Sequence, residues 1–95
     1  MSKAYWIVRV SVHNAENYQD YIAAAKPAFD KYGARHIVRG GRYEAMEGNA
    51  RERNVVVEYK DFDTAMACYN SPEYQENMKI RVANSEGTIM VVKGV

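Results

Sequence analysis

The order in which hydrophobic periodicities follow one another restricts the fold of this chain more than any other feature. The segment Ala4–Val12 alternates and is rich in β-branched and aromatic residues, which predicts a strand. Apolar residues then recur at helical spacing from Tyr18 to Tyr32. Two strand patterns, two short helical patterns and a last strand fill the rest of the 95 residues. This βαββαβ order predicts one α+β domain over residues 1–95, with one face of its sheet left bare.

The predicted elements begin and end at residues that suit helix caps and turns. Asn14 is placed to cap the first helix and Gly33 to end it. Pro27 inside the helix predicts a kink or a locally broken hydrogen bond. Paired glycines interrupt the second strand, which can resume over residues 42–46. The other predicted elements are a strand at Arg35–Arg39, a strand at Arg53–Lys60, helices capped by Asp61 or Asp63 and by Ser71, and a strand at Thr88–Lys93.

Charge and composition argue against several classes of function. Thirteen basic and twelve acidic side chains give a net charge of +1, which supplies no large field for the phosphates of a nucleic acid. No apolar run is long enough to cross a bilayer and no signal-peptide pattern precedes the first strand, so we expect no membrane partner. The single cysteine, Cys68, cannot form an internal disulfide, which fits a cytoplasmic location.

Segments spread over nearly the whole chain match the pattern of a known family. They are Tyr5-Trp6, Ala25-Lys26-Pro27-Ala28-Phe29, Val38-Arg39-Gly40-Gly41, Glu47-Gly48, Arg53–Glu58, Ala67–Tyr74 and Val92-Lys93-Gly94. Together they resemble the family catalogued as domain of unknown function 1330, in the dimeric α/β-barrel (ferredoxin-like) superfamily. The Arg-Gly-Gly and Ser-Pro-Glu-Tyr segments are the most specific parts of this resemblance.

The resemblance implies an architecture but no particular reaction. It implies a four-stranded antiparallel sheet in the order 4-1-3-2, helices on one face, and a homodimer packed sheet to sheet. The superfamily includes cofactor-free monooxygenases, haem-degrading oxygenases and muconolactone isomerases, so the fold cannot select a reaction. We therefore expect a small-molecule-binding protein or a cofactor-independent enzyme that uses the cavity of a homodimeric barrel. No sequence feature favours haem, and no cofactor is expected.

Strand parity predicts which side chains lie on the bare face of the sheet. In the first strand Trp6, Val8, Val10 and Val12 form one uniformly apolar side, which should meet the helices. The same reasoning turns His36 and Val38 of the second strand inward. The side chains expected on the bare face are Tyr5, Ile7, Arg9, Ser11, Arg35, Ile37, Arg39, Val56, Glu58 and Lys60.

Charged side chains on a face that dimerisation buries need partners. With the implied strand order, Glu58 lies on the strand between those that carry Arg9 and Arg39, provided that the strand register brings them level. One hypothesis is a small organic anion held by both arginines, with Glu58 as a base or orienting group. The ligand-binding candidates are thus Arg9, Arg39, Glu58, Tyr5, Ser11 and His36. The alternative is a non-catalytic interaction module whose Arg–Glu–Arg network only specifies dimerisation.

Other reactive residue types carry weaker signals. His13 and His36 have no neighbouring metal ligands in a known motif, so no metal site is predicted, although His36 can serve as a general base. Cys68 lies on an apolar helical stripe, where cysteine usually behaves as a small hydrophobic residue. Tyr74 and Arg81 share one helical face and either overhang the barrel mouth or serve as a core residue and a solvated cation.

Overall fold

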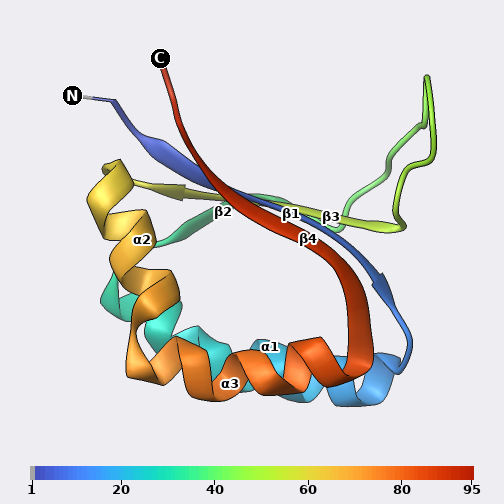
Figure 1. The fold of residues 1–95 in the computed structure, drawn as a ribbon, viewed down its shortest axis with the longest axis horizontal. Helices are drawn as coiled ribbons and strands as arrows, with labels where there is room; N and C mark the ends of the chain where they lie inside the picture. Colours follow the sequence, from blue (N-terminus) through green and yellow to red (C-terminus); the bar gives the residue numbers. More distant parts are fainter. Residues whose placement is uncertain (1) are drawn as a thin grey trace.

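The computed structural model describes residues 2–95 as a sheet covered on one face by helices (Figure 1). The first half contains β1 (Ala4–Val12), α1 (Ala15–Lys31), β2 (Arg35–Arg39) and β3 (Arg53–Tyr59). The second half contains α2 (Phe62–Asn70), α3 (Pro72–Asn84) and β4 (Ser85–Lys93). This order confirms the predicted α+β ferredoxin-like fold.

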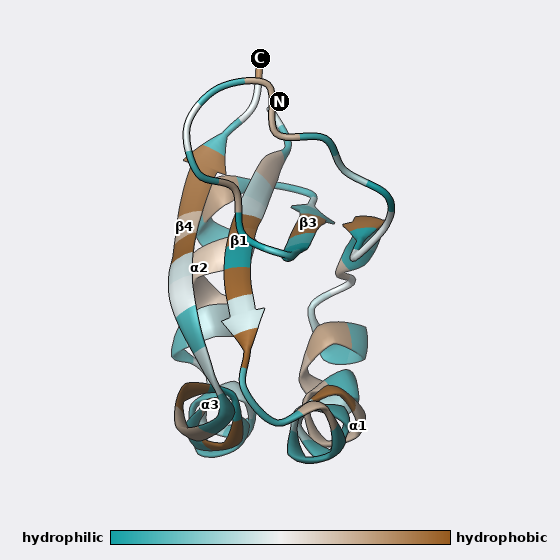
Figure 2. Ribbon diagram, turned by 90° about the vertical axis from the view of Figure 1, so that its right-hand side faces the viewer, coloured by the Kyte–Doolittle hydropathy of each residue, from teal (hydrophilic) through white to brown (hydrophobic). Residues whose placement is uncertain are grey.

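The sheet has the strand order β2-β3-β1-β4, and each neighbouring pair is antiparallel. The implied order 4-1-3-2 is therefore confirmed. All three helices lie on the same side of the sheet, and Figure 2 shows β4, β1 and β3 side by side above α3 and α1. The opposite side, which we call the open face, is covered by no helix or strand among residues 2–95. No helix in this part of the chain is long and apolar enough to cross a membrane.

The helix ends form where the sequence predicts them. The Asn14 side chain accepts a hydrogen bond from the backbone nitrogen of Asn17 at 3.0 Å, and Asp61 and Ser71 cap α2 and α3 in the same way. Gly33 follows α1 with a φ of 67°, a conformation that glycine adopts without strain. The α1 helix runs through Pro27 without interruption.

Two strand predictions need correction. Residues 42–46 form no strand, because the whole stretch 40–52 leaves the sheet as a projecting loop (Figure 1). Gly40, with a φ of 67°, turns the chain out of β2 at this point. The last strand begins at Ser85 instead of Thr88, directly after α3, and its Gly87 packs against the backbone of Arg9.

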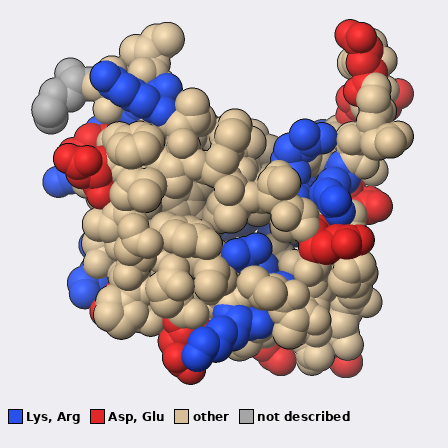
Figure 3. All heavy atoms as spheres, viewed as in Figure 1, with Lys and Arg blue, Asp and Glu red and all other residues tan. Residues whose placement is uncertain are grey.

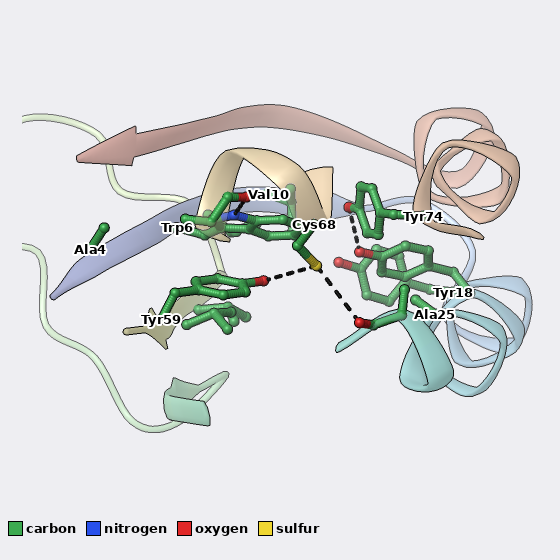
Figure 4. Packing of buried hydrophobic residues seen from close by; sticks show 14 residues of the cluster. Ala4, Trp6, Val10, Tyr18, Ala25, Tyr59, Cys68 and Tyr74 are labelled. Atoms are coloured by element: carbon green, nitrogen blue, oxygen red, sulfur yellow. Dashed lines mark hydrogen bonds between the residues drawn. The ribbon is translucent and has the colours of Figure 1, made fainter. Parts of the chain in front are cut away.

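The core between sheet and helices is built around aromatic rings (Figure 4). Trp6 is 1% exposed and contacts the rings of Phe29, Tyr59, Tyr69 and Tyr74, with centroid distances between 4.9 and 5.8 Å. Its indole nitrogen donates a hydrogen bond to the carbonyl oxygen of Ala65 in α2, at 3.0 Å. The inward side of β1 therefore anchors α2 as well as α1 and α3.

A cationic cleft between the sheet and helix α1

A cleft of about 370 Å³ lies between the helix-facing side of the sheet and α1. Its apolar walls come from β1, β3 and α1, and its polar groups come from α1, β2 and β3. The apolar lining comprises Trp6, Val8, Ile22, Phe29, Ala34, Val55 and Val57, and the polar lining comprises Tyr18, Tyr21, Lys26, Asp30, His36, Arg39 and Arg53. Its size suits a small organic molecule.

The position of Arg39 corrects the predicted face assignment of β2. The register of β2 against β3 shifts between His36 and Val38, so that Val38 lies opposite Val56 and Arg39 lies opposite Val55. Because directly paired residues share a face, Val38 lies on the open face and Arg39 on the helix side. The prediction that Arg39 faces the bare side and Val38 the core was therefore wrong. An irregularity of one residue reverses the parity of every position after it.

Arg53 reaches the cleft because it continues the inward parity of Val55 and Val57 on β3. Its guanidinium carbon lies 5.4 Å from the centre of the Tyr18 ring, a cation–π contact. A Cβ on Gly40 would lie 2.7 Å from Nη1 of Arg53, so glycine makes room for the guanidinium as the chain leaves β2. The Nε atom of Arg53 is buried and has no hydrogen-bond partner in the described part of the chain.

The cleft carries more positive than negative charge. Lys26 donates to Asp30 at 2.8 Å, so this lysine is already paired within α1. Within residues 2–95, neither Arg39 nor Arg53 has an acidic partner. Arg39 is exposed and Arg53 is partly buried. Two guanidinium groups beside an apolar cavity form a site that favours an anion, because a charge-assisted hydrogen bond from a guanidinium is strong.

His36 borders the same cleft in its neutral form. Its ring packs edge-on against Phe29 at 4.9 Å, and it lies directly opposite Val57 of β3 on the helix side, as parity predicts. Burial lowers the pKa of His36, and the charges of Arg39 and Arg53 lower it further. A neutral imidazole at neutral pH can accept a proton from an acidic ligand or donate one hydrogen bond to it.

The lowered pKa of His36 predicts how the free energy of unfolding depends on pH. The unfolded chain binds more protons at this site, so the free energy of unfolding should fall as the pH drops through the ordinary histidine range near 6.5. Replacing His36 with glutamine should flatten this part of the pH dependence, as measured by urea denaturation between pH 8 and pH 5. His13→Gln, at the other and exposed histidine, is the matched control and should retain the loss of stability that is assigned to His36. If the free energy of unfolding depended on pH equally in the wild type and the His36 variant, the lowered pKa assigned to His36 would be wrong.

The predicted cluster of Arg9, Arg39 and Glu58 does not form within one chain. Arg9 is paired with Asn54, four residues along β3 from Glu58, which corresponds to roughly 13 Å at a rise of about 3.3 Å per residue. Glu58 instead forms an ion pair with Lys3 at 3.2 Å, while Arg39 lies on the other side of the sheet. The register on which this cluster depended therefore keeps the three residues apart.

The remaining candidates, Tyr5 and Ser11, also lie on the open face. Tyr5 is half-buried opposite Glu58 and Val92. Ser11 accepts a hydrogen bond from Nη1 of Arg51 at 3.1 Å, which ties the base of the projecting loop to β1. Of the six ligand-binding candidates, the cleft thus brings together only His36 and Arg39.

Five polar residues of the cleft were not among the candidates: Arg53, Tyr18, Tyr21, Lys26 and Asp30. Carrying the alternation two residues back from Val55 identifies Arg53 as an inward cation. The tyrosines belong to the apolar stripe of α1, and nothing in the sequence distinguishes a tyrosine that borders a cavity from one that fills the core.

Neither the cysteine nor the metal-ligating residue types form a second candidate site in the described part of the chain. Cys68 is fully buried, accepts a hydrogen bond from the Tyr59 hydroxyl at 3.4 Å, and has its thiol pKa raised by burial, which suits a core residue. Among residues 2–95, no group of three or more histidine, cysteine or acidic side chains is placed to hold a metal ion.

Comparison with known proteins places the chain in a family. The family model described as Domain of unknown function (DUF1330) matches residues 3–95. The chain belongs to the DUF1330 family. A search of curated proteins found no match for this DUF1330 chain. The family resemblance inferred from the sequence is thereby confirmed.

Solved structures share the fold of this DUF1330 domain at low sequence identity. A protein of unknown function from Rhodopseudomonas palustris is 18% identical, with a TM-score of 0.81 over 99% of this chain and 83% of its own. SnoaB from Streptomyces nogalater, a cofactor-independent oxygenase, is 17% identical with a TM-score of 0.69, over 96% of this chain and 91% of its own. A dimeric ferredoxin-like protein of unknown function from Jannaschia sp. CCS1 is 19% identical with a TM-score of 0.63, over 96% of both chains.

Proposed function

We propose that this protein binds a small organic anion with an apolar body in the cleft between the sheet and α1. The observation that carries the proposal is Arg53, whose partly desolvated guanidinium borders an apolar cavity and has no acidic partner among residues 2–95. An unpaired charge in such a place is costly unless a ligand supplies the counter-charge. Arg39 adds a second cation at the β2 edge of the cleft.

The remaining lining supports an aromatic or otherwise flat ligand. Trp6, Tyr18 and Phe29 border the cavity, and aromatic side chains pack well against planar apolar groups. His36 is available in its neutral form to exchange a proton with the ligand. Turnover of the bound anion without a cofactor is the activity to assay first, because SnoaB, a cofactor-independent oxygenase, has the same fold.

A charged ligand and its neutral analogue test the binding proposal. Benzoate and benzamide have nearly the same shape, and titration calorimetry should show that the wild type binds benzoate preferentially. Arg53→Met should weaken benzoate binding by roughly 10- to 100-fold, the effect of losing a hydrogen bond to a charged group, and should leave benzamide binding unchanged. Arg35→Met is the matched control, because Arg35 is an exposed arginine of β2 that faces the open side of the sheet. Equal affinity for both compounds would rule out an anion site.

The open face supports a second proposal, that the protein forms a homodimer through this surface. Apolar side chains are exposed on this face at both edge strands: Met90 and Val92 of β4 are 56% and 40% exposed, and Val38 of β2 is 43% exposed. Exposed apolar groups gathered on one face mark an interaction surface. Similar folds from Jannaschia and Bacteroides are dimeric. Arg9 and Glu58 would then contribute polar contacts to the interface. They are two of the three residues in the network of the alternative hypothesis, and Arg39, the third, lies on the helix side.

The projecting loop favours a second copy as the occupant of this face. Residues 40–52 rise on the side of the sheet away from the helices, and the two termini rise at the opposite end (Figure 1). Acidic atoms lie at the loop tip and basic atoms near the termini (Figure 3), in keeping with Glu44 and Glu47 in the loop and Lys3 and Lys93 near the ends. An antiparallel arrangement of two copies would bring these opposite charges together.

Placing a charge at the centre of the open face tests the dimer. Ile7 lies between Val56 and Met90, so Ile7→Glu would bury a carboxylate in the proposed interface. Sedimentation velocity should show a dimer for the wild type and a monomer for this variant, with a dissociation constant raised at least about 100-fold. Glu76→Gln on the exposed side of α3 should leave the dimer intact. A monomeric wild type at micromolar concentration would refute the proposal.

A further inference from the structure

The two arginines of the cleft lie at the same corner of it. Arg39 lies directly opposite Val55 across the β2–β3 pairing, and Arg53 is two residues from Val55 along β3. The two arginines are therefore diagonal neighbours on adjacent strands, on the helix side of the sheet. The Cα atoms of such neighbours are about 7–8 Å apart, a distance that two arginine side chains can span. Both guanidinium groups can thus act on one ligand.

The contacts of Arg53 hold its guanidinium beside the end of β2. A Cβ on Gly40, the residue after Arg39, would lie 2.7 Å from Nη1 of Arg53 and 3.4 Å from its guanidinium carbon. The backbone nitrogen of Gly40 donates a hydrogen bond to the carbonyl oxygen of Asn54 at 2.9 Å, which joins the two strands at this point. The ring of Tyr18 in α1 contacts the same guanidinium. Arg53 is therefore held next to Arg39.

No ion pair within residues 2–95 balances these two charges. Of the charged residues that line the cleft, Lys26 and Asp30 pair with each other at 2.8 Å, which leaves Arg39 and Arg53. Two like charges that are held close together repel each other, most of all where water is partly excluded. A single carboxylate balances one of these charges, and a ligand with two neighbouring negative charges balances both.

The two arginines differ in their depth in the cleft. Arg53 is partly buried, whereas Arg39 is exposed. A flat ligand in the apolar part of the cleft would place one carboxylate at Arg53 and a neighbouring one at Arg39, closer to solvent. A guanidinium matches the planar geometry of a carboxylate with two parallel hydrogen bonds, so each arginine suits one carboxylate.

We propose that the cleft selects an aromatic ligand with two carboxylates on neighbouring ring atoms, one bound by Arg53 and the other by Arg39. This inference rests on the proposed anion site and narrows its ligand from an organic anion to an anion with two adjacent charges. Arg53 provides most of the affinity for any carboxylate, because it is the less hydrated of the two cations. Arg39 determines the specificity, because only a second carboxylate beside the first one reaches it.

Three benzene carboxylates test this proposal. Benzoate has one carboxylate, phthalate has two on neighbouring ring atoms, and terephthalate has two at opposite ends of the ring. At about pH 8 all of these groups are ionised, so phthalate and terephthalate differ in where the second charge lies and not in total charge. Titration calorimetry should show that the wild type binds phthalate about fivefold more tightly than either of the other two, the upper end for an ion pair at an exposed site.

Substitutions of Arg39 identify the second cation. Arg39→Met should abolish the preference for phthalate and change benzoate binding by less than about twofold. Arg39→Lys keeps the charge and should retain part of the preference. Arg35→Met is the matched control, because Arg35 is an exposed arginine of the same strand that lies on the opposite side of the sheet, and it should leave all three affinities unchanged. These variants change exposed side chains and remove no contact of the core.

The outcomes separate this inference from the proposed function. If benzoate binding depended on Arg53 but phthalate bound no more tightly than terephthalate, the selection of neighbouring carboxylates would be wrong and the anion site would stand. A preference for phthalate that persisted in Arg39→Met would also overturn the inference, because Arg39 would then not be the second cation. A wild type that bound none of the three carboxylates would overturn both proposals.

Discussion

Replacing Trp6 with alanine is expected to lower the free energy of unfolding by about 3–5 kcal/mol, the usual range for removing a large aromatic side chain from a core. Trp6 is 1% exposed and contacts four other rings, and its indole nitrogen bonds to α2. A domain of this size has a total stability of only about 5–15 kcal/mol, so the variant should lose a large share of it. Urea denaturation followed by far-UV circular dichroism measures the change.

Trp6→Phe separates the indole hydrogen bond from the aromatic packing. It retains a ring in the core but leaves the Ala65 carbonyl without its donor, which should cost about 1–3 kcal/mol. Phe62→Ala, at a residue that is 40% exposed, provides a control for removing an aromatic side chain outside the core. If Trp6→Ala were no less stable than Phe62→Ala, the described core would be wrong.

Gly87→Ala is expected to be the next most damaging substitution tested, with a loss of at least about 3 kcal/mol, at the upper end of overpacking effects. A Cβ at this position would overlap the carbonyl oxygen of Arg9 and lie 2.7 Å from Cα of Val10. Both atoms belong to the backbone of the neighbouring strand β1, which cannot yield as a flexible side chain can. The thermal unfolding midpoint should fall by more than 10 °C for a domain of this size.

Gly41→Ala is the control for this substitution. A Cβ on Gly41 would have no atom within 4 Å, so the variant should unfold near the wild-type temperature. A strongly lowered midpoint for Gly41→Ala, or an unchanged one for Gly87→Ala, would contradict the described packing of β4 on β1.

The helices and strands could be predicted from the sequence, because each one has its own capping residues or its own hydrophobic periodicity. Asn14, Asp61 and Ser71 cap their helices as the sequence predicts, and the alternation in β1 and β3 identifies the inward residues. These features depend on neighbours a few residues apart, so the sequence displays them directly. The family resemblance supplied the strand order, which no local pattern contains.

The candidate site was predicted less well, because it depends on relations between distant segments. The irregularity between His36 and Val38 has no sequence signal of its own, yet it determines on which side of the sheet Arg39 lies. The register of β1 against β3 separates Arg9 from Glu58, and register is set by the whole hydrophobic pattern of the sheet. Arg81 is buried because of the way α3 packs against α1 and β4, and the hydrophobic periodicity of α3 does not specify this packing.

If the protein binds both the proposed ligand and a second copy of itself, the alternation of β3 makes one strand serve both. Val55 faces the cleft and Val56 the open face, so the wall between a bound ligand and a second protein molecule is one backbone thick. Neighbouring positions would then meet unrelated requirements: the odd-numbered residues of β3 would contact the small molecule, and the even-numbered ones would contact the partner. A point mutation at an inward residue of β3 would then change the preference of the cleft for its ligand and leave the residues of the open face unchanged.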